Sequence, residues 1–204
     1  MIDLRKQFFD FWCISAEKKQ FEIMANCNYE SNLSSIVMYD DDAVLVEIAR
    51  SMGLSLYHEY YRLDAVLFND ATDKVPNCPK GQTWLSTIQI AFEHENYINS
   101  GLFQEVSHLM ITDCNLGVLV TYPNTEDEIK REIKILHKLI SDSLFGKRTI
   151  RHKNILLIFG WQMPEKLIWF ACSYEANDWE MLNDNIDLYL DLCNFQTNPF
   201  SIHK

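Results

Sequence analysis

The chain has 204 residues, of which 48% are hydrophobic and 13% aromatic, and it carries a formal net charge of −11. This length and composition fit one globular domain with a proper core, and they exclude a disordered chain dominated by charge. No run approaches the ~20 apolar residues of a membrane-spanning helix, and the charged start does not resemble a secretory signal, so we expect a cytoplasmic protein without membrane contact.

The N-terminal quarter of the chain predicts two helices. Apolar residues recur at helical spacing over residues 3–25, and a second amphipathic helix spans 43–52, with polar, turn-rich residues over 26–41 between them. Gly53 stands where a C-terminal glycine is expected. Two acids precede the second helix as candidate N-caps, Asp41 and Asp42.

Strand character follows the second helix. We expect strands over 55–60, 62–68 and 84–95, with a loop or hairpin connection over 69–81, where Asn, Asp, Pro and Gly gather. The third strand alternates apolar and other residues with a period of two, as a half-buried strand does.

The next segment predicts a helix over 98–110, then a short and almost wholly apolar strand over 116–122. Such a strand is usually buried on both faces, as in a parallel sheet covered by helices. Thr125 and Glu128 then have the spacing of a capping box, with Thr125 as the N-cap of a helix that carries a regular apolar stripe.

The C-terminal part predicts two more strands, over 154–161 and 166–173, and a last helix over 178–193. The whole order predicts a single α/β domain over residues 1–204, built on a central mixed β-sheet flanked by helices. The six cysteines form no Cys-x-x-Cys pair, so we interpret them as reduced thiols and not as a zinc site.

Three acids on the predicted strands carry the chemical signal. Asp64 lies within an apolar strand, and Glu93 and Glu95 lie at the end of the next, where alternation places them on the same face. Carboxylates that converge repel one another, and a divalent cation relieves this repulsion. The alternative is that Glu93 and Glu95 lie beyond the strand and are solvated.

The stretch over 43–122 resembles the PD-(D/E)XK nuclease superfamily, which includes the restriction endonucleases. Its pattern places an acid on one strand, matched by Asp64, and acid-x-lysine on the next, where this chain has Glu93 and Glu95. A helix and another strand follow in both. The resemblance implies a restriction-endonuclease-like core, with N-terminal helices and a C-terminal α/β part as additions.

The resemblance also implies roles for individual residues. Asp64 and Glu93 would hold Mg²⁺ or Mn²⁺, and Glu95 would be a further ligand or a general base in place of the lysine. Glu47, on the helix before the strands, would be a third metal ligand, or else an ordinary solvated side chain. His108 shares one side of its helix with Gln104 and Glu105, and would supply a polar catalytic group, or else be an ordinary surface residue.

The net charge of −11 argues against a nucleic-acid-binding protein, because binding to phosphates requires positive charge. One segment of the chain, however, is basic. Eight of the eighteen basic residues fall within residues 130–153. They predict a strip that contacts phosphates, with a normal solvated helix face as the equal alternative. The residues expected to contact nucleic acid are Lys130, Arg131, Lys134, Lys138, Arg148 and Arg151.

Two functions therefore fit the sequence. The first is a metal-dependent nuclease that hydrolyses DNA phosphodiester bonds, with catalytic residues Asp64, Glu93, Glu95 and His108. The second is a catalytically inactive module on the same fold that binds a protein partner through its acidic surface, as an inhibitor, immunity protein or complex subunit. Because restriction-type enzymes often act as dimers on a two-fold duplex, a homodimer is an expected arrangement.

Overall fold

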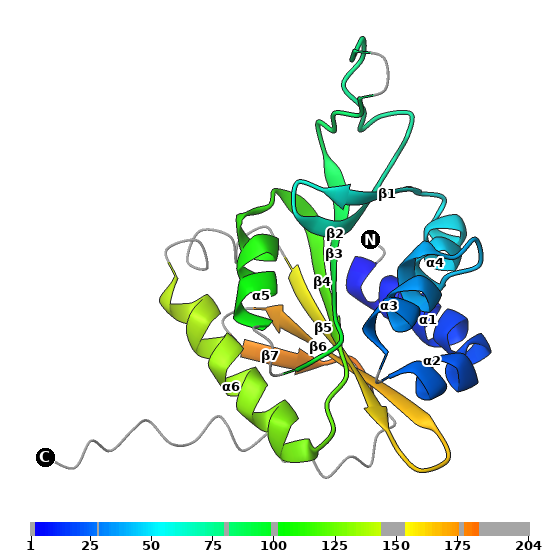
Figure 1. The fold of residues 1–204 in the computed structure, drawn as a ribbon. Helices are drawn as coiled ribbons and strands as arrows, with labels where there is room; N and C mark the ends of the chain where they lie inside the picture. The colour runs from blue at the N-terminus through cyan, green and yellow to red at the C-terminus, as the bar shows by residue number, and fades with distance from the viewer. Residues whose placement is uncertain are drawn as a thin grey trace, which may run out of the picture.

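A seven-stranded sheet lies between two layers of helices in the computed structural model (Figure 1), which describes residues 3–27, 29–79, 82–98, 102–143, 154–175 and 178–183. Helices α1 to α4 cover one face of the sheet, and α5 and α6 cover the other. The predicted mixed sheet flanked by helices is confirmed. None of the helices within these ranges combines the length and the apolar composition that crossing a bilayer requires.

The N-terminal layer is more helical than the sequence suggested. Its elements are α1 (Leu4–Lys18), α2 (Gln20–Asn26), α3 (Glu30–Ser34), the π-helical turn η1 (Ser35–Tyr39) and α4 (Val44–Met52). The expectation of polar turns over 26–41 is wrong for residues 30–39, because Ile36, Val37 and Met38 are buried in the core and hold this part in helical form, whereas residues 40–42 do form a turn.

The two ends of α4 differ in how well they were predicted. Gly53 ends the helix in the left-handed conformation, with φ of 66°, as expected. The N-cap is Ala43, which makes no side-chain cap hydrogen bond, so capping by Asp41 or Asp42 is wrong. The Asp42 carboxylate instead accepts a hydrogen bond from Lys19 Nζ at 2.6 Å.

The strands run through the sheet in chain order. They are β1 (Ser55–Tyr60), β2 (Leu63–Phe68), β3 (Ile88–Glu95), β4 (Cys114–Thr121), β5 (Asn154–Gln162), β6 (Leu167–Glu175) and β7 (Asp178–Met181). The pairs from β1 to β3 are antiparallel, β3, β4 and β5 are parallel, and the pairs from β5 to β7 are antiparallel again. The sheet is therefore mixed, with a parallel centre and antiparallel edges.

The C-terminal helix predicted over 178–193 is wrong at its start. Residues 178–181 form β7, which pairs with β6 from Glu175↔Asp178 to Cys172↔Met181. The partner strand thus overrides the local helical pattern. Residues 184–193 of that predicted helix lie outside the described residues.

Helices make both crossovers between the parallel strands. Helix α5 (Leu102–Ile111) joins β3 to β4, and α6 (Glu126–Asp142) joins β4 to β5. Both bury apolar side chains against the same face of the sheet, α5 with Val106 and Leu109, and α6 with Ile133. Because β3, β4 and β5 are parallel, their carboxyl ends meet at one edge of the sheet, which is where α/β folds commonly place their sites.

The start of α6 confirms the predicted N-cap. The Thr125 hydroxyl accepts a hydrogen bond from the backbone N–H of Glu128 at 3.2 Å. The Glu128 carboxylate accepts from the backbone N–H of Asn124 at 2.8 Å, one residue before the N-cap, where a standard capping box would use the N-cap itself.

Replacing Thr125 by alanine should lower the free energy of unfolding by about 1 kcal/mol, because the N–H of Glu128 loses its partner. Urea denaturation followed by far-ultraviolet circular dichroism measures this difference. Serine at the same position is the matched control and should keep most of the stability, since its hydroxyl is also a good N-cap. Equal stability of the alanine and serine variants would contradict the capping role.

The cysteines that the structure describes form no disulfide with one another: Cys13, Cys27, Cys78, Cys114 and Cys172.

Candidate metal centre of carboxylates and histidine

Asp64 and Glu93 meet where the backbone pairing of β2 and β3 ends. The paired register of these strands runs from Leu67↔Ile90 to Ala65↔Phe92, so Asp64 and Glu93 follow directly beyond it. The backbone N–H of Asp64 donates to Glu93 Oε2 at 3.1 Å, and the backbone N–H of His94 donates to Asp64 Oδ2 at 2.7 Å. Each acid thus uses one oxygen to replace a missing ladder hydrogen bond, which fixes its position.

Helix α5 brings two more polar side chains to Glu93. Glu93 lies two residues after Ala91, which packs in the core beneath α5 and α6, so its side chain faces α5. His108 Nδ1 lies 3.2 Å from Glu93 Oε1 and 3.4 Å from Glu105 Oε2. Glu105 and His108 are one helical turn apart, which places them on the same side of α5.

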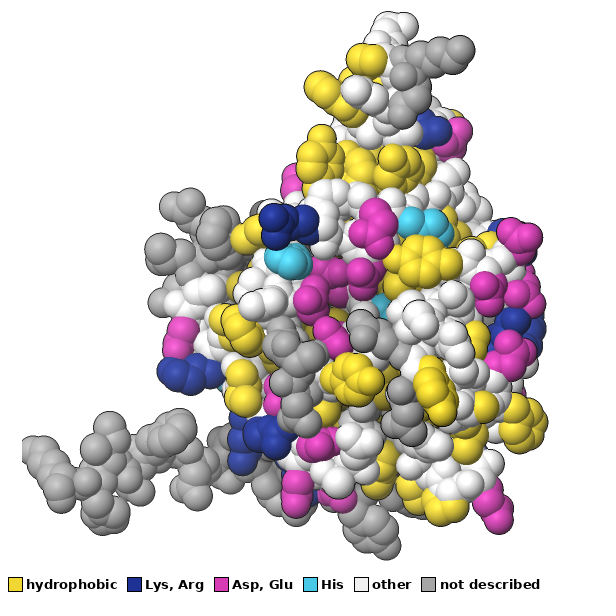
Figure 2. Space-filling view, viewed as in Figure 1, with side chains coloured by type: hydrophobic (Ala, Val, Ile, Leu, Met, Phe, Trp, Pro, Cys, Tyr) yellow, Lys and Arg dark blue, Asp and Glu magenta, His cyan; other side chains and the backbone are white. Residues whose placement is uncertain are grey.

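The cluster of Asp64, Glu93, Glu105 and His108 is called the acidic centre below. Its exposure is graded: the Glu93 side chain is 1% exposed, Glu105 24% and His108 34%. Figure 2 shows acidic side chains gathered near the middle of one face, with histidine and hydrophobic side chains around them. A solute would therefore reach Glu105 and His108 first and Glu93 last.

Burial and mutual repulsion strongly disfavour the ionised acids. Burial raises the pKa of Asp64 to about 6, and the negative charges of Glu105, Glu59 and Glu95 add to the rise, against the hydrogen bond from the backbone of His94. Burial likewise raises the pKa of Glu93 to about 9, and Asp64 and Glu105 raise it further. Both shifts have the sign expected where a positive charge would be stabilised.

Three of the four residues of the acidic centre offer ligand atoms that fit a divalent cation. One ligand atom each from Glu93, Glu105 and His108 lie within 4.8 Å of one another. Ligand atoms around one first-row cation lie about 3 Å apart, because each is about 2.0–2.2 Å from the metal. The separations of 3.2 and 3.4 Å at His108 Nδ1 are close to this value. Two carboxylates and one imidazole suit manganese or zinc better than magnesium, which prefers oxygen ligands.

Glu95, one of the predicted catalytic residues, lies at the border of the acidic centre. Its negative charge helps to raise the pKa of Asp64. Its Oε1, however, accepts a hydrogen bond from the backbone N–H of Tyr97 at 3.0 Å. Glu59 of β1, whose charge also acts on Asp64, accepts a hydrogen bond from the Tyr39 hydroxyl at 2.7 Å. Burial and this hydrogen bond raise the pKa of Tyr39, so its hydroxyl stays protonated.

The structure does not bring Glu47, a predicted metal ligand, into the acidic centre. Its Oε1 lies 2.7 Å from an Arg50 guanidinium nitrogen, and its Oε2 lies 3.7 Å from Lys18 Nζ. Glu47 therefore joins helices α1 and α4 through ion pairs. The residue that completes the centre in its place is Glu105, which the sequence offered only as a neighbour of His108 on their helix.

His94 is buried on the face of β3 opposite Glu93 and Glu95, as strand alternation requires. Its Nε2 lies 3.0 Å from the Tyr122 hydroxyl. Burial lowers the pKa of His94 to about 3, so its ring is neutral and its role is structural.

Most of the predicted nucleic-acid-binding cations that the structure describes are paired with acids on α6 itself. Lys130 lies 2.5 Å from Glu126, Arg131 lies 3.1 Å from Glu132, and Lys138 lies 2.5 Å from Asp142. Lys134 is exposed on the same helix, whereas Arg148 and Arg151 lie outside the described residues. These pairs reduce the positive potential that a phosphate-contacting strip requires.

The sequence matches none of the family models and none of the curated proteins with which it was compared.

Proposed function

We propose that the protein is a metal-dependent phosphodiesterase that hydrolyses nucleic acid, with the acidic centre as its active site. The observation that carries the proposal is the convergence of Asp64 and Glu93 with Glu105 and His108 at one end of the β2–β3 pair. The element order around it, a helix, three strands, a helix and a strand, agrees with the resemblance to the PD-(D/E)XK superfamily.

Each residue has a role that follows from its position. Glu93, Glu105 and His108 would hold the cation, Mn²⁺ in preference to Mg²⁺, and Asp64, which lies outside this group of three, would offer Oδ1, since its Oδ2 is already held by the backbone of His94. A cation held there would supply the positive charge that activates water for attack and stabilises a phosphoryl transition state. Glu95, at the border of the centre, would accept a proton from the attacking water, in the position that lysine has in the superfamily pattern.

A cleavage assay tests this proposal directly. Labelled single-stranded DNA, duplex DNA and RNA are incubated with the protein and manganese, magnesium or EDTA. We expect cleavage of at least one substrate with manganese and none with EDTA. Asp64→Asn should abolish it, because the amide keeps the hydrogen bond from His94 but loses the charge that a cation requires.

The matched control is Asp113→Asn, an exposed acid directly before β4, at the opposite edge of the sheet from the acidic centre. It should cleave like the wild type. Cleavage retained by Asp64→Asn, or absent from the wild type with every metal and substrate, would overturn the proposal.

A second function is favoured by one observation. Asp64 has acidic neighbours in Glu59, Glu95 and Glu105, and the position two residues after Glu93 is glutamate where the superfamily pattern has lysine. A module that binds a basic protein partner through this face would need no cleavage chemistry. It predicts that Glu59→Gln and Glu95→Gln weaken a complex recovered from cell extract by salt-sensitive pull-down, without any nuclease activity in the wild type.

A further inference from the structure

A pocket of about 150 Å³ opens at the carboxyl ends of the parallel strands, apart from the acidic centre. Its wall comes from the segments that follow β3 and β4 and from the end of β5, closed on one side by the end of α2. The lining residues are Cys27, Asn96, Tyr97, Ile98, Tyr122, Pro123, Asn124, Gly160 and Gln162. Parallel strands commonly end at ligand sites of this kind.

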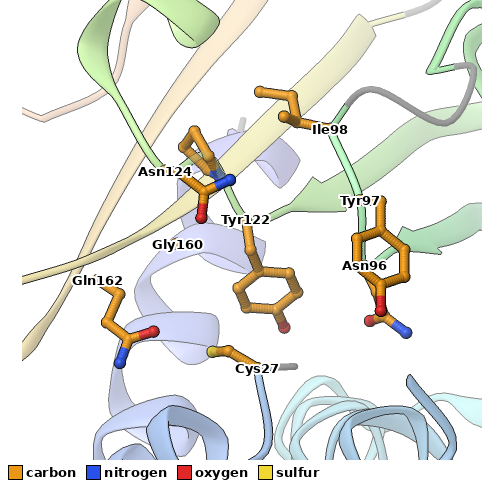
Figure 3. A pocket seen from close by; sticks show the side chains of 9 residues that line it. Cys27, Asn96, Tyr97, Ile98, Tyr122, Asn124, Gly160 and Gln162 are labelled. Carbon is orange, nitrogen blue, oxygen red and sulfur yellow. The ribbon is translucent and has the colours of Figure 1, made fainter. Parts of the chain in front are cut away.

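The lining offers no opposite charge to a charged ligand, and its amides suit a polar ring. None of the nine lining residues is charged, and three of them, Asn96, Asn124 and Gln162, carry primary amides. A carboxamide presents a donor and an acceptor side by side, which is the pattern that base edges recognise. In Figure 3 the Tyr122 ring lies between Cys27 and Gln162 on one side and Asn96 and Tyr97 on the other.

The size and rigidity of the pocket narrow the choice of ring. A cavity of about 150 Å³ accommodates one benzene-sized ring. The Tyr122 hydroxyl lies 3.0 Å from His94 Nε2, which fixes the position of this ring. A Cβ on Gly160 would lie 2.9 Å from Tyr122 Cδ1, so a larger residue at position 160 would clash with the ring. The exposed side chains of Asn124 and Gln162 leave the mouth open for whatever the ring is attached to.

One backbone segment joins the pocket to the acidic centre. Asn96 and Tyr97, both in the pocket lining, directly follow Glu95, and Glu95 Oε1 accepts the hydrogen bond from the backbone of Tyr97. The pocket lining therefore begins one residue after Glu95 in the chain, and its Tyr122 wall contacts His94 on the face of the sheet opposite Glu93. Unstacked bases are recognised in this way, by hydrogen bonds to their edges and contact with aromatic rings.

We infer that this pocket binds a single unstacked pyrimidine base. If the proposed function holds, the substrate is single-stranded or locally unpaired nucleic acid, and this part of the inference rests on that function. As a statement about the pocket, it requires no metal and stands on the lining alone.

Calorimetric titration of nucleosides into the full chain in EDTA tests the pocket. Cytidine or uridine should bind at least about tenfold more tightly than guanosine, a difference of ~1.4 kcal/mol, because the purine exceeds one ring. Ribose 5-phosphate, which has no base, should not bind. Equal binding of purines, binding of ribose 5-phosphate, or no binding of any nucleoside at millimolar concentration would overturn the inference.

Variants locate the binding. Asn124→Leu and Gln162→Met keep side-chain volume and remove amide groups, so each should weaken pyrimidine binding about tenfold. Gln82→Met, which removes an exposed amide far along the β2–β3 connection, is the matched control and should bind like the wild type. Unchanged affinity in both pocket variants would place the ligand elsewhere and overturn the inference.

The same titration on Glu93→Gln separates the pocket from the proposed catalysis. Pyrimidine binding should be unchanged in this variant. If the protein binds pyrimidines but cleaves no nucleic acid, the pocket inference stands and the phosphodiesterase proposal fails. If it cleaves nucleic acid but binds no pyrimidine, the proposed function stands and the pocket inference fails.

Discussion

Replacing Glu93 by glutamine should weaken manganese binding by about a hundredfold or more. Removing a residue that only hydrogen-bonds to a metal ligand lowers metal affinity about 10- to 100-fold, and Glu93 would be a ligand itself. Glu93 is the hub of the acidic centre: Oε1 lies 3.2 Å from His108 Nδ1, and Oε2 accepts from the backbone of Asp64. Glutamine keeps the size and one acceptor oxygen but not the charge. Calorimetric titration of manganese into metal-free protein measures the loss, and cleavage should vanish with it.

The matched control for this prediction is Glu47→Gln. Glu47 was the other glutamate expected to bind metal, and its carboxylate is instead paired with Arg50 and Lys18. This variant should bind manganese with the affinity of the wild type. Equal loss in both variants would mean that manganese binds to the acidic surface in general and not at the acidic centre.

The metal-free protein should lose stability as the pH rises from about 4 to about 9. In the folded state the pKa of Asp64 is raised to about 6 and that of Glu93 to about 9, above their ordinary values of 3.8 and 4.5. A raised carboxyl pKa means that the folded state holds its proton more tightly than the unfolded state. Its contribution to stability is therefore complete below the unfolded pKa and is lost as the pH rises through the folded pKa.

The loss is best measured as a difference between the wild type and Glu93→Gln, because other acids titrate as well. Glutamine cannot ionise, so the variant should be more stable than the wild type at pH 9 by a few kcal/mol, and the two should converge near pH 4. Urea denaturation in EDTA at several pH values gives the curve. Manganese should raise the stability of the wild type at pH 9 and leave the variant unchanged.

A constant difference between the two proteins at all pH values would contradict the ionisation argument. It would mean that glutamine alters packing and not the cost of a buried charge. Reversal of the difference, with the wild type more stable at high pH without metal, would show that the charge of Glu93 is already neutralised within the protein.

The strand pattern predicted the sheet well because alternation and apolar runs are local signals. Asp64 and Glu93 were predicted as neighbours from their places on adjacent strands, and the register places them together at the end of the ladder. The helix predicted over 178–193 failed at β7 because strand pairing with β6 is a long-range interaction, which no local pattern contains.

The membership of the acidic centre was harder to predict than its location. Helical spacing related Glu105 to His108, but which of the two helices supplies a third acid depends on how each one rotates against the sheet. Helix α5 turns Glu105 toward Glu93, whereas α4 turns Glu47 toward α1, where Lys18 lies. The small pocket had no sequence signal at all, since its lining comes from four separate segments whose residues are individually unremarkable for loops and strand ends.

The hydrogen bonds at the end of β2 and β3 give Asp64 and Glu93 a structural role in addition to any catalytic one. Asp64 and Glu93 each complete the backbone pairing of the sheet, so a descendant that lost all catalysis would still gain stability from keeping both acids. Their retention in a homologue would then report on folding as much as on chemistry. Glu105 and His108 bind no backbone of the sheet in this way, and they are the positions where a change from active enzyme to inactive paralogue would first be visible.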